Sequence, residues 1–146
     1  MMRLMSAPPT SYSVSARTDA EGHSEIATGG VRIPFDSSWG ADAPSGLLGP
    51  AELLASALAA CLLKGLARAR VMLPFEYSSA EVQVTAHRQD APPKFTKLEY
   101  EVRIVTGETQ HRVELLHRNL AQFGTIYNTL AAACDVHGTV VATPAG

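Results

Sequence analysis

The sequence predicts an α+β protein, in which helices are segregated from an antiparallel sheet. Three observations support this class. Residues 79–87 and 95–105 alternate apolar and polar side chains, which is typical of strands with one buried face. Residues 53–66 form one long apolar stretch, and residues 108–123 have apolar side chains at helical spacing. The strands and the helices therefore fall in separate parts of the chain.

The first fifty residues predict a strand hairpin followed by a loop. Residues 11–17 alternate as a half-buried strand does, and residues 19–22 supply turn-forming side chains. A second arm is expected over residues 23–35, with Gly29-Gly30 as a turn or bulge. Residues 36–49 contain three glycines, one proline and the single tryptophan without any periodicity, so they predict a long loop.

The central helix is the longest predicted element. Pro50 suits its first turn, where a missing N–H costs nothing, and Pro74 forces a stop, so we expect a helix over residues 50–71. Four residues fall on one stripe of this helix: Leu54, Leu58, Cys61 and Gly65. We therefore expect Cys61 to face a packed neighbour.

The next segment predicts an antiparallel strand pair with one face in water. Its strands cover residues 79–87 and 95–105, and residues 90–93 join them with turn-forming side chains. A last strand is expected over residues 134–142.

Two helices are predicted between these strands. The first covers residues 108–123, with an inward face of Val113, Leu116, Leu120 and Phe123 and an outward face of Glu108, Arg112 and Glu114. Gly124 ends this helix, and Thr125 is expected to cap the N-terminus of a shorter helix over residues 125–133.

Composition predicts a soluble protein without nucleic-acid or membrane partners. The chain has 146 residues, of which 46% are hydrophobic and 18% charged. Twelve basic and fourteen acidic residues give a net charge of −2 and form no run, so neither nucleic acid nor an anionic membrane is expected to bind. We expect a flexible lead-in over residues 1–10 and a single domain over residues 11–143.

Two features predict a cytoplasmic location. The apolar stretch over residues 53–66 is too short and too rich in alanine to span a membrane core of about 30 Å. The N-terminus is broken by Pro8 and Pro9 and lacks the continuous apolar stretch of a signal peptide.

The central helix carries a resemblance to a known family. The segment Pro50-x-Glu52-Leu53-Leu54-Ala55-x-Ala57-Leu58-Ala59-Ala60-Cys61 is followed, about sixty residues later, by an amphipathic helix and by Asn128-Thr129-Leu130. This pattern resembles the OsmC/Ohr family of osmotically induced and organic-hydroperoxide-resistance proteins, and its OsmC-like branch in particular. The resemblance implies the OsmC-like fold, with antiparallel sheets and a long central helix, in an intertwined homodimer. It also implies a thiol-dependent peroxidase of oxidative-stress defence, with organic hydroperoxides as substrates and an external thiol as reductant.

The resemblance makes Cys61 the peroxidatic cysteine. A thiolate at this position attacks a peroxide and becomes a sulfenic acid. A second thiol then condenses with the sulfenic acid to form a disulfide. Gly124 occupies the place of that second, resolving cysteine. Cys134 lies ten residues later, about 15 Å along a helix, whereas a disulfide needs Cα atoms within about 7 Å. We therefore expect at most one-cysteine chemistry.

Several other residues are candidates to support Cys61. The resemblance suggests an arginine, Arg17 or Arg32, and a glutamate directly after the helix-opening proline. Ala51 holds that position here, and Glu52, one residue later, lies on the opposite side of the helix from Cys61. Lys64 and Arg68 lie one and two turns beyond Cys61, where inward-pointing cations would stabilise a thiolate, although a surface role is the simpler expectation. Thr125 and Tyr127 are candidates to bind a ligand beside Gly124.

No metal and no cofactor is expected. His111 and His117 lie about 240° apart around a helix, and Cys134 with His137 supplies only two ligands, whereas zinc needs three or four. An alternative to the peroxidase remains open: a non-redox protein that binds a small hydrophobic molecule in a pocket at the dimer interface, with Cys61 kept for packing.

Overall fold

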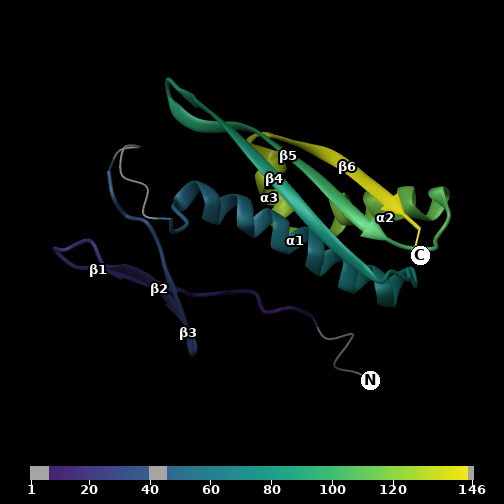
Figure 1. The fold of residues 1–146 in the computed structure, drawn as a ribbon, viewed down its shortest axis with the longest axis horizontal. Coiled ribbons are helices and arrows are strands. Elements are labelled where there is room, and N and C mark those ends of the chain that lie inside the picture. The colour runs from purple at the N-terminus through teal and green to yellow at the C-terminus, as the bar shows by residue number, and fades with distance from the viewer. Residues whose placement is uncertain (1–6, 40–45, 145–146) are drawn as a thin grey trace. The chain divides into compact units, whose positions relative to one another are not determined.

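The structure is a computed structural model that describes residues 7–39 and 46–144 (Figure 1). The chain divides into two compact units, Met1–Pro50 and Ala51–Gly146. A single domain over residues 11–143 after a lead-in over residues 1–10 stays a prediction, and part of that lead-in and part of the predicted loop lie outside the described residues.

The first unit contains an antiparallel three-stranded sheet. Its strands are β1 (Ser15–Thr18), β2 (Ser24–Thr28) and β3 (Val31–Pro34), paired in the order β1-β2-β3. The predicted hairpin is present, but its second arm is two strands, because the chain reverses at Gly29, whose φ is +54°. A glycine adopts this left-handed conformation at little steric cost.

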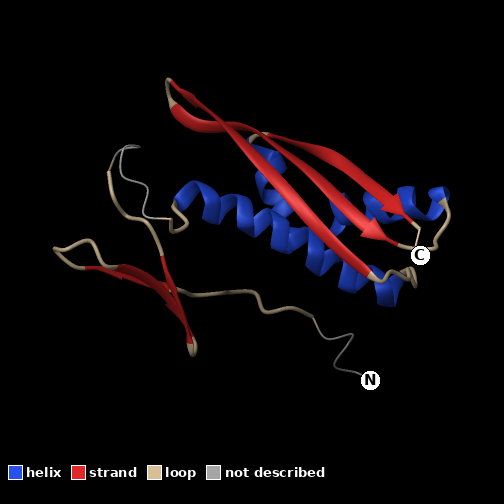
Figure 2. Cartoon of the chain, in the orientation of Figure 1, coloured by secondary structure: helices blue, strands red, loops and turns tan. Residues whose placement is uncertain are grey.

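The second unit contains a second sheet with three helices on one of its faces (Figure 2). Its elements, in chain order, are α1 (Pro50–Met72), β4 (Ser79–Asp90), β5 (Pro93–Val105), α2 (Gln110–Phe123), α3 (Thr125–Ala133) and β6 (Asp135–Thr143). The order of helices and strands is the predicted one, and the α+β class is confirmed.

The second sheet is mixed rather than wholly antiparallel. β4 and β5 pair antiparallel, as predicted, whereas β6 runs parallel to β5 along its whole length. The connection between the two strands explains this direction. α2 and α3 carry the chain back to the end of the sheet at which β5 begins, so that β6 starts there and runs in the same direction as β5.

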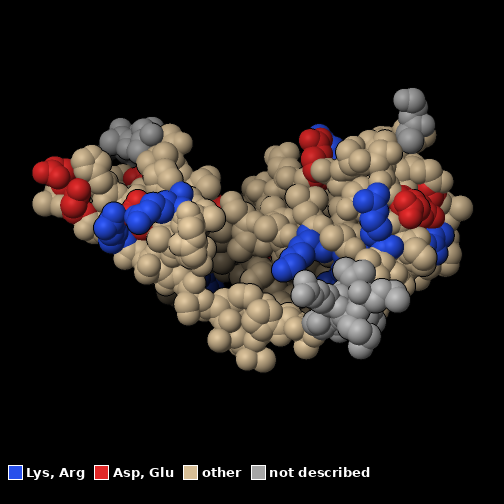
Figure 3. Space-filling view, turned by 90° about the horizontal axis from the view of Figure 1, so that it is seen from below, with Lys and Arg blue, Asp and Glu red and all other residues tan. Residues whose placement is uncertain are grey.

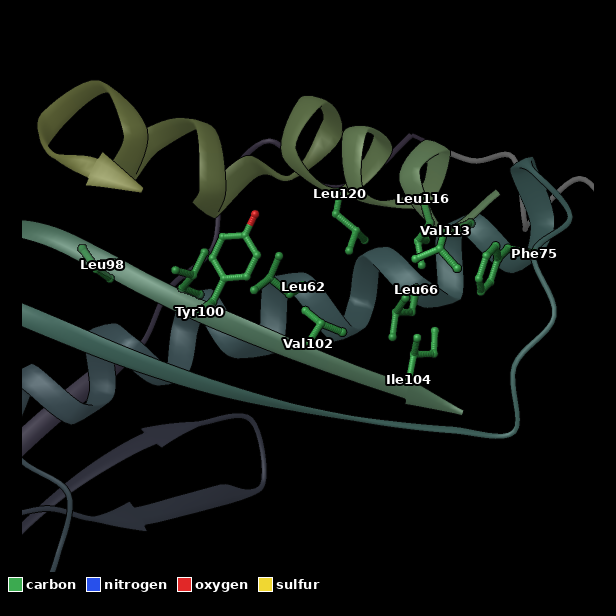
Figure 4. Close-up of a cluster of buried hydrophobic side chains, with 12 residues drawn as sticks. Leu62, Leu66, Phe75, Leu98, Tyr100, Val102, Ile104, Val113, Leu116 and Leu120 are labelled. Atoms are coloured by element: carbon green, nitrogen blue, oxygen red, sulfur yellow. The ribbon is translucent and has the colours of Figure 1, made fainter. Parts of the chain in front are cut away.

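The core of the second unit lies between this sheet and α1 and α2. Figure 4 shows side chains from α1, α2 and β5 meeting in one apolar cluster. The fully or nearly fully buried members are Leu58, Leu62, Leu66, Ala69, Phe75, Leu98, Tyr100, Val102, Ile104, Val113, Leu116 and Leu120. On α1 the buried stripe therefore runs through Leu58, Leu62 and Leu66, and Cys61 lies beside it and is only partly buried.

The apolar stretch over residues 53–66 was predicted to be too short to span a membrane, but the whole of α1 is longer. α1 is long and apolar enough to cross a membrane by length and composition alone. A core helix passes the same test, although such a helix is mostly buried, whereas 22% of the apolar window of α1 is buried in the structure. Leu58, Leu62 and Leu66 are its large buried side chains.

The start of α2 differs from the prediction. Thr109 caps the helix and accepts a hydrogen bond from the Arg112 N–H, so Glu108 precedes it. Glu108 and Arg112, expected to point outward, are partly buried because they pair at 2.8 Å. The Glu108 carboxylate also accepts a hydrogen bond from the Glu76 N–H, and this bond, followed by the ion pair, lowers the pKa of Glu108.

The junction of α2 and α3 also corrects two expectations. Phe123, predicted to point inward, is 54% exposed. It is the last residue of α2, and its ring lies under the guanidinium of Arg68 at 5.7 Å. Gly124, not Thr125, is the N-cap of α3, and no side chain caps that helix.

Charges of both signs are mixed over the surface. On the outer face of the second sheet, Glu99 binds both Lys97 and His87, at 2.9 and 3.1 Å. In the view of Figure 3, basic and acidic side chains lie near one another instead of gathering into one patch.

Candidate functional site

Cys61 and Gly124 face each other across two elements. Cys61 lies on α1, and Gly124 joins α2 to α3. A Cβ atom added to Gly124 would lie 3.0 Å from the Sγ of Cys61. The structure thus brings together the two positions that the sequence singled out for a nucleophile and for a missing partner.

This spacing is that of a disulfide. With an S–S bond of about 2.04 Å, the Cβ of one cysteine lies about 3 Å from the sulfur of the other. The Cβ position at Gly124 meets this condition with respect to Cys61. A thiol at this point would be placed to react with Cys61, and the glycine supplies none.

The surroundings of Gly124 are tight. The same added Cβ would lie 3.1 Å from both the carbonyl oxygen of Leu120 and the Cβ of Tyr127, and Gly124 is buried. Gly124 is also the N-cap of α3. Because the first N–H groups of a helix have no partner within it, this end carries partial positive charge, which favours an anion beside it.

Cys134 lies at the other end of α3. It caps the C-terminus of that nine-residue helix, and its thiol contacts the carbonyl oxygen of Leu130 at 3.4 Å. Nine helical residues rise about 13 Å. Both cysteines are free thiols, and the helix separates Cys134 from the position that faces Cys61.

Arg68 supports α2 and is not a free cation beside Cys61. Its guanidinium donates hydrogen bonds to the side-chain and main-chain oxygens of Asn119 and to the carbonyl oxygen of Phe123, at 3.1 to 3.3 Å. These acceptors belong to the last two turns of α2, whose C-terminal carbonyls attract cations. Lys64 is exposed, which agrees with the surface role expected for it.

Arg17 and Arg32 share one carboxylate in the first unit. Arg17 binds the Oε1 of Glu25 at 2.7 Å, and Arg32 binds the same oxygen at 2.6 Å. The three residues lie on β1, β2 and β3, and they place two guanidinium groups on one side of the first sheet. Glu52 is exposed in the first turn of α1.

The first unit also has a hollow of about 600 Å³. It is lined in part by Arg17, His23, Glu25 and Phe35. All of its lining residues belong to the first unit.

Tyr127 packs against the core of the second unit. Its hydroxyl lies 3.2 Å from the hydroxyl of Tyr100 and donates to the carbonyl oxygen of Val136 at 3.4 Å. The Tyr100 hydroxyl lies 2.6 Å from the Nε2 of His117 as well. Thr125, the other ligand candidate, is exposed in the first turn of α3.

Sequence reasoning missed this hydrogen-bonded group of Tyr100, His117 and Tyr127. The available signal was the phase of β5, in which Tyr100 falls between the inward Leu98 and Val102. A tyrosine on a buried face needs a partner for its hydroxyl. Nothing local names that partner, because His117 and Tyr127 follow 17 and 27 residues later.

Burial favours the neutral forms of Tyr100 and His117. Desolvation, followed by the hydrogen bond to Tyr127, raises the pKa of Tyr100 far above its usual value. Desolvation lowers the pKa of His117, since burial disfavours the charged imidazolium.

One cluster of possible metal ligands is present among the described residues. Asp19, Glu21 and His23 bring their ligand atoms within 4.8 Å of one another in the turn between β1 and β2, and all three are exposed. Asp19 already accepts hydrogen bonds from the N–H groups of Glu21 and His23, and the bond from His23 is the main cause of its lowered pKa.

Comparison with known proteins gives one family and a set of similar folds. A family model described as OsmC-like protein matches residues 43–137, more than half of the chain. No curated protein matches the sequence significantly.

Solved structures match nearly the full chain at low identity. The OsmC-like protein of Mycoplasma pneumoniae superposes with a TM-score of 0.79 at 17% identity, covering 94% of this chain and 99% of its own. An organic hydroperoxide resistance protein OsmC of Legionella pneumophila gives 0.71 at 18%, with coverages of 89% and 97%. An organic hydroperoxide resistance protein of Elizabethkingia anophelis gives 0.71 at 16%, with coverages of 92% and 99%.

Proposed function

Because the chain belongs to the OsmC-like protein family, we propose that it reduces organic hydroperoxides with Cys61 as its only working cysteine. The observation that carries this proposal is the 3.0 Å between the Cys61 sulfur and the Cβ position of Gly124. This distance supports a site related to a two-cysteine centre, with a glycine in the place of the second cysteine. Two structural neighbours named as organic hydroperoxide resistance proteins support the choice of substrate.

The proposed reaction uses two external thiols for each hydroperoxide. The Cys61 thiolate attacks the outer oxygen of ROOH and the O–O bond breaks, so that Cys61 becomes a sulfenic acid and an alkoxide leaves. The alkoxide takes a proton from water and becomes the alcohol. A first thiol then displaces water and forms a mixed disulfide with Cys61. A second thiol attacks that disulfide and restores the Cys61 thiol. The peroxide gains two electrons, and the two external thiols lose them as a disulfide.

The chain's own groups favour the first step. Cys61 is partly buried and not enclosed in the apolar core, and it lies beside the N-terminus of α3, whose partial positive charge favours the negative charge of the leaving oxygen. No metal or organic cofactor takes part. A reducing compartment such as the cytoplasm would supply the external thiol.

Consumption of cumene hydroperoxide by the reduced protein tests the proposal, with dithiothreitol and dihydrolipoamide as alternative reductants. Cys61→Ser should abolish turnover, since a serine hydroxyl does not replace a thiolate as nucleophile toward peroxide. Cys134→Ser is the matched control and should keep the parent rate. Turnover by the parent no faster than that of free cysteine would contradict the proposal.

We also propose a homodimer. Large apolar side chains of the second unit remain exposed on α1, α2, α3 and β6: Leu63, Val71, Met72, Phe123, Ile126 and Val141. α3 has no fully buried residue. A second copy of the chain is the partner that the family suggests for these surfaces. Sedimentation at micromolar concentration should give twice the chain mass of 15.5 kDa, and a monomeric mass would refute this assembly.

A further inference from the structure

Tyr100 binds one helix on each side of Gly124. Its hydroxyl lies 2.6 Å from the Nε2 of His117, which is on α2 seven residues before Gly124. The same hydroxyl lies 3.2 Å from that of Tyr127, on α3 three residues after Gly124. The rings also meet edge to face, with centroids 5.7 and 5.9 Å apart.

The backbone of Tyr100 is held in the sheet, so its side chain can anchor both α2 and α3. It lies in β5, the central strand of the sheet, which is hydrogen-bonded to β4 on one side and to β6 on the other. The residue is 4% exposed, and Figure 4 shows its hydroxyl pointing out of the apolar cluster, away from the strand. A side chain anchored in this way holds its partners in place and does not follow them.

The hydrogen bonds of the three side chains are mutually consistent. A tyrosine hydroxyl has one donor and two acceptor sites, so Tyr100 serves both partners at once. When His117 donates from Nε2, Tyr100 donates to Tyr127, and Tyr127 donates to the carbonyl oxygen of Val136. All of these groups then have partners without any buried charge.

Tyr127 connects this group to Cys61. The Cβ of Tyr127 and the sulfur of Cys61 each lie about 3 Å from the same point, the Cβ position of Gly124. The two atoms are therefore at most about 6 Å apart, as the two distances of 3.1 and 3.0 Å require. A shift of α3 relative to the sheet would move the wall that faces the nucleophile.

We propose that Tyr100 is a positioning residue, which sets the distance between Cys61 and the junction of α2 and α3 by binding His117 and Tyr127. Its role in turnover rests on the proposed peroxide chemistry of Cys61. The positioning itself is measurable without peroxide.

The test introduces a thiol at the junction as a reporter. In a Gly124→Cys, Cys134→Ser background, the protein is equilibrated with mixtures of reduced and oxidised glutathione. Oxidised glutathione takes the two electrons and two protons of the protein dithiol as the internal disulfide closes. The equilibrium constant gives the effective concentration of the introduced thiol toward Cys61.

Tyr100→Phe removes the hydrogen bonds to both His117 and Tyr127, and in this background it should lower the effective concentration at least about tenfold. Tyr77→Phe is the matched control, because Tyr77 packs against the same core beside Arg70 and should leave the value unchanged. Equal values in Tyr100→Phe and the parent would overturn the proposal, and so would an equal loss in Tyr77→Phe.

Variants of His117 give a second test, which does not require the Tyr100→Phe variant to fold. His117→Gln keeps a polar nitrogen near Tyr100 and should restore most of the effective concentration that His117→Leu loses. Equal losses in both variants would contradict positioning through the hydrogen bond. Because no peroxide enters these measurements, their failure is distinct from a failure of Cys61→Ser to abolish turnover.

Discussion

The two three-stranded sheets differ in what covers them. One face of β4-β5-β6 lies beneath three helices, and its inward side chains join a continuous apolar core. In β1-β2-β3, whose strands are four or five residues long, Ser24 is the only strand residue that is buried. The first sheet is held by its backbone ladder, by turn hydrogen bonds at Asp19 and by the pairing of Arg17 and Arg32 with Glu25.

The two units differ in how much apolar surface they bury. A short sheet without a covered apolar face is marginally stable in water, and the first unit leaves Tyr12, Val14 and Val31 more than half exposed. The second unit has a core of its own. We therefore expect substitutions in the second sheet to act on the folding of the chain, and substitutions in the first sheet to act weakly.

The largest effect is expected for Gly138→Ala in β6. A Cβ at this position would lie 2.1 Å from the carbonyl oxygen of Tyr100 on the neighbouring strand, and 2.5 Å from its ring. Because backbone blocks the added atom, the strands must separate, and the free energy of unfolding should fall by more than about 4 kcal/mol. Gly107→Ala is the control, since nothing lies within 4 Å of its Cβ position. Urea unfolding compares the two, and a stable Gly138→Ala would break the contrast between the sheets.

The next effect separates two adjacent leucines of α1. Leu62 is 1% exposed and Leu63 is 39% exposed. Leu62→Ala leaves a cavity in the core and should cost about 2–5 kcal/mol of unfolding free energy. Leu63→Ala should cost far less in folding, and should weaken the proposed dimer instead. Thermal unfolding and sedimentation of both variants would show this, and equal losses of stability would argue that α1 is buried all round.

Much of the second unit could be predicted because its signals are local. Pro50 and Pro74 mark the ends of α1, and the period-2 pattern marks β4 and β5. Gly124 opposite Cys61 followed from the resemblance of two segments to one family. The inward direction predicted for Phe123 was wrong because Phe123 is the last residue of α2, and its ring lies against the guanidinium of Arg68 instead of in the core.

Other features of the site depend on contacts that leave no local pattern. The binding of Arg68 to the end of α2 joins residues about fifty apart in the chain. The group of Tyr100, His117 and Tyr127 needs the crossing of a strand and two helices. Spacing within one element predicts which face a residue lies on, and only the packing of elements decides which partner it meets.

A smaller effect is expected from the pH. The folded state lowers the pKa of His117, so its stabilising contribution is complete above the usual histidine pKa of about 6.5 and is lost as the pH falls through the lowered value. The parent should therefore lose stability relative to His117→Gln between pH 7.5 and pH 5. Urea midpoints of both proteins at each pH measure this difference, in which the titration of distant carboxylates cancels. If the urea midpoints of the two proteins fell by the same amount, the imidazole of His117 would be as well solvated in the folded protein as in the unfolded chain.

The smallest effect is expected in the first sheet, where Glu25→Gln removes the carboxylate that Arg17 and Arg32 share. The side chains of both arginines are mostly exposed, at 76% and 65%, so water already screens the pairs and the change in unfolding free energy should be about 1 kcal/mol or less. High salt should shrink the difference further, because it screens exposed charges. Urea unfolding at 0.05 and 0.5 M salt measures this, with Glu21→Gln in the exposed β1–β2 turn as the control. A loss as large as that of Leu62→Ala would mean that the first sheet is held mainly by its charges, and that the absence of a core there does not make it weak.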